Sequence, residues 1–452
     1  MRFVVYFLTI SCLITAHLLG SIEGASSSDT DKIEDVSEGC LVQMKLSNGM
    51  TVWLKPTSFE SDEIFIKLTA LGGTAELPSK DRFSGELAAQ IAWESGMGGF
   101  SSDQISVLLY EHSLEFVPKI QPFCRVIEGT SGKEGLEAFL KCTHMLFTQK
   151  NFSREGWKAA KIVSKTSLSK MACDYDLAYE AAFLSVNTQG FQALQPMSVE
   201  DLDKVDFDLA KAFFQRCFSN PQGFVCVIVG SFDIDSAKAL VNHYLGSIPT
   251  EEPPFNFNQP EPAPFPPGIT NKEIHLSQRP DSLTRLTFPL QISLNEKSIH
   301  QLAFMCQVIE ARLRRVITQN MKLSYGIDVC YEFPLYPLLD NPWISIRFRC
   351  DNQLVDKLKQ IVIHELKLFQ DRGVTQEEMV EIKKLEAGSD DYWLRDNFYW
   401  MSMLTNYYLW KWDPEWIYLG STETKDLNSK TIDELLKTSF SLKNYSIITA
   451  KP

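Results

Sequence analysis

The chain has 452 residues, of which 44% are hydrophobic and 22% are charged, and its formal net charge is −13. This length is enough for roughly two to four domains. The acidic balance argues against nucleic acid or an anionic membrane surface as a partner, because both attract clustered lysine and arginine side chains.

The first residues have the pattern of a secretory signal peptide. Arg2 precedes an apolar run from Phe3 to Leu19, and small residues follow directly. We therefore predict a signal peptide at residues 1–24, a disordered polar segment at 25–39, and export of the mature chain to the periplasm or out of the cell. The run is also just long enough to span a bilayer, so an uncleaved N-terminal anchor is the alternative. No later segment of the sequence is apolar enough to cross a membrane.

The number and spacing of the cysteines argue against a disulfide-stabilised domain. Ten cysteines are present, and Cys12 lies within the predicted signal peptide. The others are scattered and form no Cys-x-x-Cys pair. The odd number that remains, in a chain of this length, predicts neither a disulfide framework nor a zinc-finger site.

From Cys40 the sequence alternates between strand-like and helix-like segments. Asn48-Gly49 separates two apolar runs and predicts a β-hairpin. Apolar residues alternate in EIFIKLTAL (63–71), which predicts a half-buried strand. Two segments have apolar positions at helical spacing, residues 84–95 and 136–147, and the first runs into a glycine-rich turn. The sequence FVCVIVG (224–230) predicts a short buried strand.

A proline-rich segment divides the mature chain into two nearly equal parts. Residues 249–268 contain eight prolines in twenty positions. Because proline is excluded from helix interiors and central strands, we predict an extended linker here. The two predicted domains are therefore residues 40–248 and 269–452.

The two parts repeat the same order of elements. Residues 124–162 and 344–385 each contain a strand, a polar turn, an amphipathic helix and a second helix, and Thr375 with Glu378 forms a capping box in the second copy. Chance similarity of pattern is the alternative to duplication. We predict two homologous α+β domains, each with helices packed on one sheet. The aromatic segment 392–416 is interpreted as a large apolar helix face, with a chamber lining or a partner contact as alternatives.

Three short motifs and the linker, taken in order, resemble the pitrilysin/insulinase family of metallopeptidases. The motifs are LSNGMTVWLKPT (46–57), LTALGGTAEL (68–77) and YLGSIP (244–249). The resemblance covers residues 40–452 and is nearest to the C-terminal half of the long, two-half periplasmic zinc peptidases. It implies an α+β fold of two homologous domains that forms half of a closed chamber.

The resemblance also shows which catalytic residues are missing. In active halves a helix carries His-x-x-Glu-His, whose histidines bind zinc and whose glutamate activates water. The corresponding stretch of this chain runs from Gln90 to Glu94 and contains no histidine. No histidine elsewhere forms the motif. We therefore expect no catalytic residue, no metal ligand and no cofactor in this chain, with zinc present only in an active partner half.

One substrate-binding residue of the family is retained in the sequence. Family members place an arginine and a tyrosine seven residues apart near the scissile carbonyl. This chain keeps the tyrosine as Tyr325, but Thr318 stands where the arginine is expected. Tyr325 is thus a candidate substrate-binding residue that donates a hydrogen bond, and a packed tyrosine at the start of a strand is the alternative.

These observations predict a non-catalytic homologue of the family. It would pair with a half that carries His-x-x-Glu-His, close the chamber and help to bind extended peptide at a sheet edge. The alternatives are a free-standing peptide-binding or scaffold protein on the same fold, and an active metalloendopeptidase.

Overall fold

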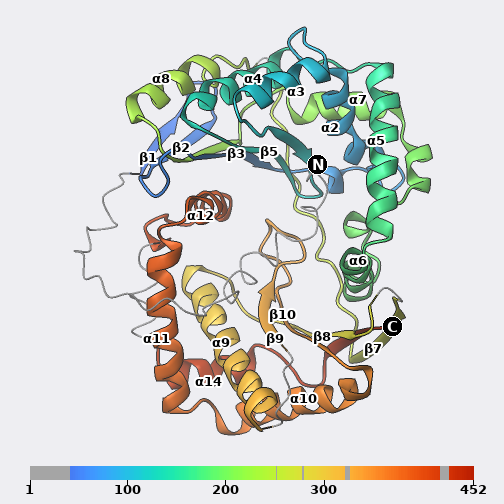
Figure 1. The fold of residues 1–452 in the computed structure, drawn as a ribbon, viewed down its shortest axis with the longest axis vertical. Helices are drawn as coiled ribbons and strands as arrows, with labels where there is room; N and C mark the ends of the chain where they lie inside the picture. The colour runs from blue at the N-terminus through green and yellow to red at the C-terminus, as the bar shows by residue number, and fades with distance from the viewer. Residues whose placement is uncertain (1–40, 251, 277–278, 321–325, 418–426) are drawn as a thin grey trace.

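The computed structural model describes residues 41–250, 252–276, 279–320, 326–417 and 427–452. The predicted signal peptide and polar segment lie outside these residues, and so does Tyr325. The described residues form two α+β units, each with one sheet and a layer of helices (Figure 1). The predicted fold class is therefore confirmed. No helix among the described residues is long and apolar enough to span a bilayer.

The first unit contains a mixed sheet with the order β1-β2-β6-β3-β5-β4. The predicted hairpin at Asn48-Gly49 is present, because β1 and β2 pair antiparallel on either side of it. Gly49 has a φ of 86°, which favours glycine. The pair β2 and β6 is parallel, whereas the other neighbours are antiparallel. The strands are β1 (Val42–Lys45), β2 (Thr51–Pro56), β3 (Ile64–Leu71), β4 (Val117–Ile120), β5 (Cys124–Ser131) and β6 (Val225–Gly230).

Helices cover one face of this sheet and enclose the first core. The two helices expected from apolar spacing are present as α2 and α4. Several helices begin at a serine or aspartate whose side chain accepts a backbone N–H, as in α5, which is capped by Ser153. The helices are α2 (Arg82–Ser95), α3 (Ser102–Glu111), α4 (Leu136–Thr148), α5 (Arg154–Ala172), α6 (Tyr175–Asn187), α7 (Phe207–Cys217) and α8 (Ile234–Tyr244).

The second unit repeats the arrangement of the first. Its sheet has the order β7-β11-β8-β10-β9, again with one parallel pair, β7 and β11, followed by antiparallel neighbours. This match of strand order and direction supports the predicted repeat. The strands are β7 (Ile269–His275), β8 (Ser282–Pro289), β9 (Ile327–Glu332), β10 (Trp343–Cys350) and β11 (Tyr445–Lys451).

The helices of the second unit follow the same plan. The predicted capping box is present: the Thr375 N–H donates to Glu378 Oε2 at 2.9 Å, and the Glu378 N–H donates to Thr375 Oγ1 at 3.2 Å. A π-helical turn, Val316–Asn320, extends α9. The helices are α9 (Glu296–Arg315), α10 (Val355–Arg372), α11 (Gln376–Trp393), α12 (Asn397–Trp410) and α14 (Ser429–Thr438).

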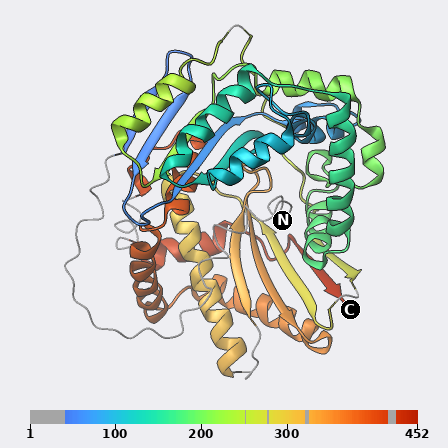
Figure 2. The same ribbon diagram turned by 45° about the horizontal axis from the view of Figure 1, so that its top comes forward.

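Each unit also contributes one helix that packs on the sheet of the other (Figures 1 and 2). The sheet of the first unit is called sheet 1 below, and the sheet of the second unit is called sheet 2. Helix α6 of the first unit packs on sheet 2, where Tyr179 donates a hydrogen bond of 3.0 Å to the Ile448 carbonyl oxygen. Helix α12 of the second unit packs on sheet 1, with Trp400 buried against Val227 and its neighbours. The aromatic segment is thus an apolar helix face within the chain along α12.

This exchange corrects the prediction for residues 63–71. Strand β3 was expected to be half-buried, but its side chains are buried on both faces. Helices of the first unit cover one face, and α12 covers the other. The period-2 alternation of the sequence gives no sign of a helix that comes from residues more than three hundred positions later in the chain.

The proline-rich segment has no regular secondary structure from residue 252 to residue 266, but its aromatic side chains pack against both units. The Phe255 ring lies 4.2 Å from the Arg125 guanidinium carbon. Phe265 contacts the Trp343 ring edge to face at 5.8 Å between centroids. The segment therefore packs against both units and helps to fix them together.

Candidate functional site

Helix α2 occupies the place where the family resemblance puts the metal motif. Its apolar positions face the first core, with Ile91 at 0% and Leu87 at 4% exposure. The helix ends at Gly96, whose φ of 76° suits a glycine after the last turn. The opposite face of the helix carries the polar residues that would have to form a site.

The two positions that correspond to zinc-binding histidines bind each other. Gln90 Nε2 donates a hydrogen bond of 2.7 Å to Glu94 Oε1. Trp93, at the position of the catalytic glutamate, stacks on Phe116 with 6.4 Å between ring centroids. An amide and one carboxylate do not supply the imidazole or thiolate set that zinc requires, so these residues do not fit the metal.

The wider described structure offers no substitute. Among the residues described, no group of three His, Cys, Asp or Glu side chains is arranged to hold a metal ion. The eight cysteines that the structure describes form no disulfide with one another, and Cys226 is fully buried in β6. The absence of zinc from the purified chain stays a prediction.

One carboxyl group on α2 has an unusual pKa. Burial raises the pKa of Glu86 to about 7, and the ion pair with Arg82 offsets this only in part. Arg82 Nη1 lies 2.6 Å from Glu86 Oε1 and 2.5 Å from the Gln195 carbonyl oxygen. Arg82 therefore links α2 to the segment that follows α6. Sequence analysis did not single out Glu86, and its i,i+4 spacing from Arg82 was the available signal.

Two of the described histidines lie between helices. His144 Nδ1 lies 2.8 Å from the Tyr244 carbonyl oxygen and links α4 to α8. His300 Nε2 lies 4.0 Å from Glu386 Oε2, between α9 and α11. Both side chains have structural partners, as expected for histidines outside a metal site.

The candidate substrate-binding residue Tyr325 lies outside the described residues, whereas Thr318 and the arginines that precede it in the sequence are described. Thr318 is exposed, and its hydroxyl donates a hydrogen bond of 2.6 Å to the Arg314 carbonyl oxygen. Arg314 forms an ion pair with Glu310 at 2.7 Å, and Arg315 forms one with Glu381 at 2.5 Å. The two arginines that precede Thr318 in the sequence are therefore both engaged in ion pairs with glutamates.

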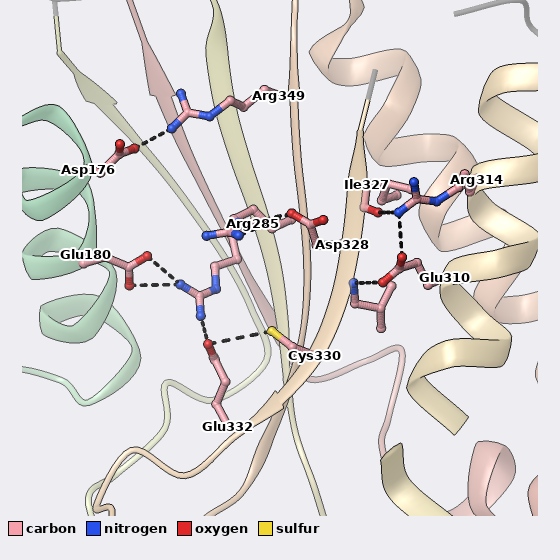
Figure 3. A network of polar contacts seen from close by, with 12 residues as sticks. Asp176, Glu180, Arg285, Glu310, Arg314, Ile327, Asp328, Cys330, Glu332 and Arg349 are labelled. Carbon is pink, nitrogen blue, oxygen red and sulfur yellow. Dashed lines mark hydrogen bonds and ion pairs between the residues drawn. The ribbon is translucent and has the colours of Figure 1, made fainter. Parts of the chain in front are cut away.

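Two buried polar clusters at the junction of the units were not foreseen. In the first, Arg285 on β8 is 2% exposed and donates to both carboxylate oxygens of Glu180 on α6, at 3.1 and 3.0 Å. Its other terminal nitrogen binds Glu332 of β9 (Figure 3). The Phe183 ring lies 3.6 Å from the guanidinium carbon. This cluster fastens α6 to sheet 2.

The second cluster lies on sheet 1 under α12. Lys67 Nζ and Lys119 Nζ approach Glu128 at 3.5 and 2.6 Å. Burial opposes the charge on Lys67, but Glu128, Tyr336 and Cys124 together outweigh this effect, so the Lys67 pKa is raised. Lys67, Glu128, Cys124 and Tyr336 line a small hollow there. The charged residues in otherwise apolar strands were the sequence signal for both clusters.

Three comparisons place this geometry among known proteins. Residues 204–386 match the family model described as "Peptidase M16 inactive domain". A protein named "Zinc protease PQQL-like" from Arabidopsis thaliana is 25% identical over 386 residues, which cover 81% of this chain and 37% of that protein. The chain therefore spans well under half the length of that relative.

Two solved structures share the fold. The periplasmic protease PqqL from Escherichia coli aligns with a TM-score of 0.74 and 17% identity, over 95% of this chain and 48% of that one. A peptidase M16 inactive domain from Pseudomonas fluorescens aligns with a TM-score of 0.74 and 13% identity, over 91% of this chain and 98% of that one. The matches confirm the predicted resemblance to one half of a longer peptidase.

Proposed function

We propose that this chain, which is similar to the M16 peptidase inactive domain and to a PQQL-like zinc protease, is the non-catalytic half of a two-part zinc peptidase. A half that carries His-x-x-Glu-His would supply the metal and the catalytic glutamate. This chain would close the chamber and help to bind extended peptide. The zinc chemistry would lie wholly in the partner.

The observation that carries the proposal is the state of α2. The positions of the metal motif are filled by a Gln90–Glu94 hydrogen bond and by a partly buried tryptophan that stacks on Phe116. Both contacts support a packing role for the helix within the proposed non-catalytic half. The match to 48% of the PqqL chain and to nearly all of an isolated inactive domain supports a half-molecule role.

Export of the chain belongs to the same proposal. The Escherichia coli relative is described as periplasmic, and the sequence from Arg2 to Leu19 fits a signal peptide. A chain exported on its own would need to meet its catalytic half outside the cytosol. Fractionation of the host, with N-terminal sequencing of the mature protein, tests this part.

The central experiment is a pull-down of the tagged full chain from its native host, followed by mass spectrometry and reconstitution. We expect a His-x-x-Glu-His protein to be recovered in equal amount. Peptide cleavage should require both proteins, zinc, and the histidines of the partner. A chain that stays monomeric beside that half at high concentration would contradict the proposal.

The same assays separate the two alternatives. A free-standing scaffold would bind peptide but give no gain in cleavage with any catalytic half. An independent metalloendopeptidase would cleave peptide alone, and a chelator would abolish the cleavage. The isolated chain, assayed with and without added zinc, is the control for both.

A further inference from the structure

Four strands form the edges of the two sheets, and they differ in their capacity to accept another strand. They are β1 and β4 in sheet 1 and β7 and β9 in sheet 2. An added strand bonds to the outward N–H and C=O groups of alternate residues on an edge. Which residues point outward follows from the hydrogen bonds that each edge makes with its inner neighbour.

Strand β4 has a gap in its outward donors. The Glu115 N–H donates to the Thr130 carbonyl and the Gln121 N–H donates to the Cys124 carbonyl, so odd-numbered residues face β5. Pro118 therefore lies at an outward position and has no N–H. Strand β1 has four residues, which gives a short edge.

Strand β9 is already occupied by side chains of α9. The Val329 N–H donates to Glu310 Oε2 at 3.0 Å, and the Ile327 carbonyl accepts from Arg314 Nη2 at 3.2 Å. Glu310 and Arg314 also pair with each other at 2.7 Å, so together they take the place of a neighbouring strand (Figure 3). An incoming peptide would have to break this pair.

Strand β7 is different. It lies at the border of the second unit near the C-terminus (Figure 1) and is exposed over most of its length. The Gly268 carbonyl accepts from Tyr445 and the Leu276 N–H donates to Lys451, so even-numbered residues face β11. The outward residues are Ile269, Asn271, Glu273 and His275. None is a proline, and no side chain in the described parts of the chain hydrogen-bonds to their backbone groups.

The charges along β7 favour one kind of added strand. Glu273 is neutralised by Lys451 at 2.7 Å. Lys272, in the middle of the strand, is exposed and forms no ion pair with any residue that the structure describes. Ile269, at the start of the strand and on its other face, is 58% exposed. A lone edge lysine can simply deter unwanted pairing, but a carboxylate on an added strand would neutralise it.

We propose that the outer edge of β7 is the site where this chain binds extended polypeptide, with an acidic residue of the bound segment beside Lys272. This inference rests on the peptide-binding part of the proposed function and does not require the catalytic half. It names the edge, the orientation of the backbone groups and the charge preference of the bound segment. The blocked state of β4 and β9 leaves β7 as the long open edge among the described strands.

The test uses the isolated full chain and two labelled peptides of alternating threonine and valine, one with a central glutamate and one with a central lysine. Asn271→Pro removes an outward N–H while leaving the bonds to β11 in place, and Asn271→Ala is the matched control that keeps the N–H. We expect Asn271→Pro to weaken binding of the glutamate peptide about tenfold and Asn271→Ala to change it by less than about twofold. Lys272→Glu should reverse the preference between the two peptides. Circular dichroism and thermal unfolding verify the fold of each variant.

Hydrogen exchange gives a second readout. Bound peptide should slow exchange of residues 269–275 and leave residues 327–332 unchanged. Equal binding by the two Asn271 variants, protection at β9 instead, or no binding at about 1 mM peptide would overturn the proposal. A variant effect on self-association without an effect on peptide would assign the edge to a second copy and also overturn it. Recovery of the catalytic half in the pull-down is a separate result, so the two proposals fail independently.

Discussion

The Arg285 cluster gives a sharp test of how the two units are joined. Arg285 lies between Glu180 of α6 and Glu332 of β9, with side-chain exposures of 2%, 19% and 5%. Replacing it by methionine in Arg285→Met keeps most of the side-chain volume. It removes the positive charge that contacts both carboxylates.

The expected loss is large because the charges that remain are buried. Removing one partner of a buried ion pair costs about 3–5 kcal/mol. The matched control is Arg279→Met, at the same junction of α6 and the second unit. Arg279 pairs with Asp176 at 3.3 Å, and the two side chains are 45% and 54% exposed. An exposed pair of this kind contributes about 0–1 kcal/mol.

Urea unfolding followed by circular dichroism measures both free energies. Because α6 and α12 are exchanged between the units, we expect one cooperative transition in the wild type. Equal losses for Arg285→Met and Arg279→Met, both under about 1 kcal/mol, would refute the buried-charge reasoning. Two separate transitions in the wild type would refute the coupling of the units.

Three further predictions concern the metal, the pH dependence and the aromatic helix. The purified chain should contain no stoichiometric zinc by elemental analysis, and one tightly held zinc per chain would contradict the reading of α2. The pKa of Glu86 is raised from 4.5 to about 7, so the folded state holds a proton that the unfolded state releases, and stability should fall as the pH rises from about 5 to 8. The Glu86→Gln variant should flatten this pH dependence of thermal unfolding. An unchanged pH dependence in the variant would exclude Glu86 as its cause. Trp400→Ala should cost about 3–5 kcal/mol in urea unfolding, because Trp400 is 1% exposed. Phe398→Ala, at a position 42% exposed on the same helix, should cost clearly less, and similar losses would contradict the packing of α12 on sheet 1.

Local features of this fold could be predicted from sequence because their causes are local. The hairpin follows from the conformational freedom of Gly49, and the start of α11 follows from the reciprocal hydrogen bonds of Thr375 and Glu378. Helix α2 follows from the spacing of its apolar residues. Each of these signals lies within a few positions of the structure that it produces.

Features that join distant segments could not be predicted in this way. The burial of β3 on both faces depends on α12, and the ion pair of Arg285 with Glu180 depends on the position of α6. Lys67 and Arg285 stand in apolar strands, which signals a buried partner but not which one. Predicting that Glu310 and Arg314 occupy the outer edge of β9 requires the register of the sheet as well as the i,i+4 spacing of these two residues.

A zinc site also depends on residues from distant segments, so substitutions on α2 alone should not restore it. Gln90→His with Glu94→His would place two imidazoles one turn apart on the half-buried polar face of α2, in place of the present hydrogen bond. A zinc site needs three or four protein ligands, and the double variant introduces two. We therefore expect weak zinc binding by the double variant, with a dissociation constant above about 1 μM in calorimetric titration. Adding Trp93→Glu should not strengthen it and should lower stability, because it removes the stack on Phe116. Tight, stoichiometric zinc binding by either variant would show that the rest of a metal site survives in this chain.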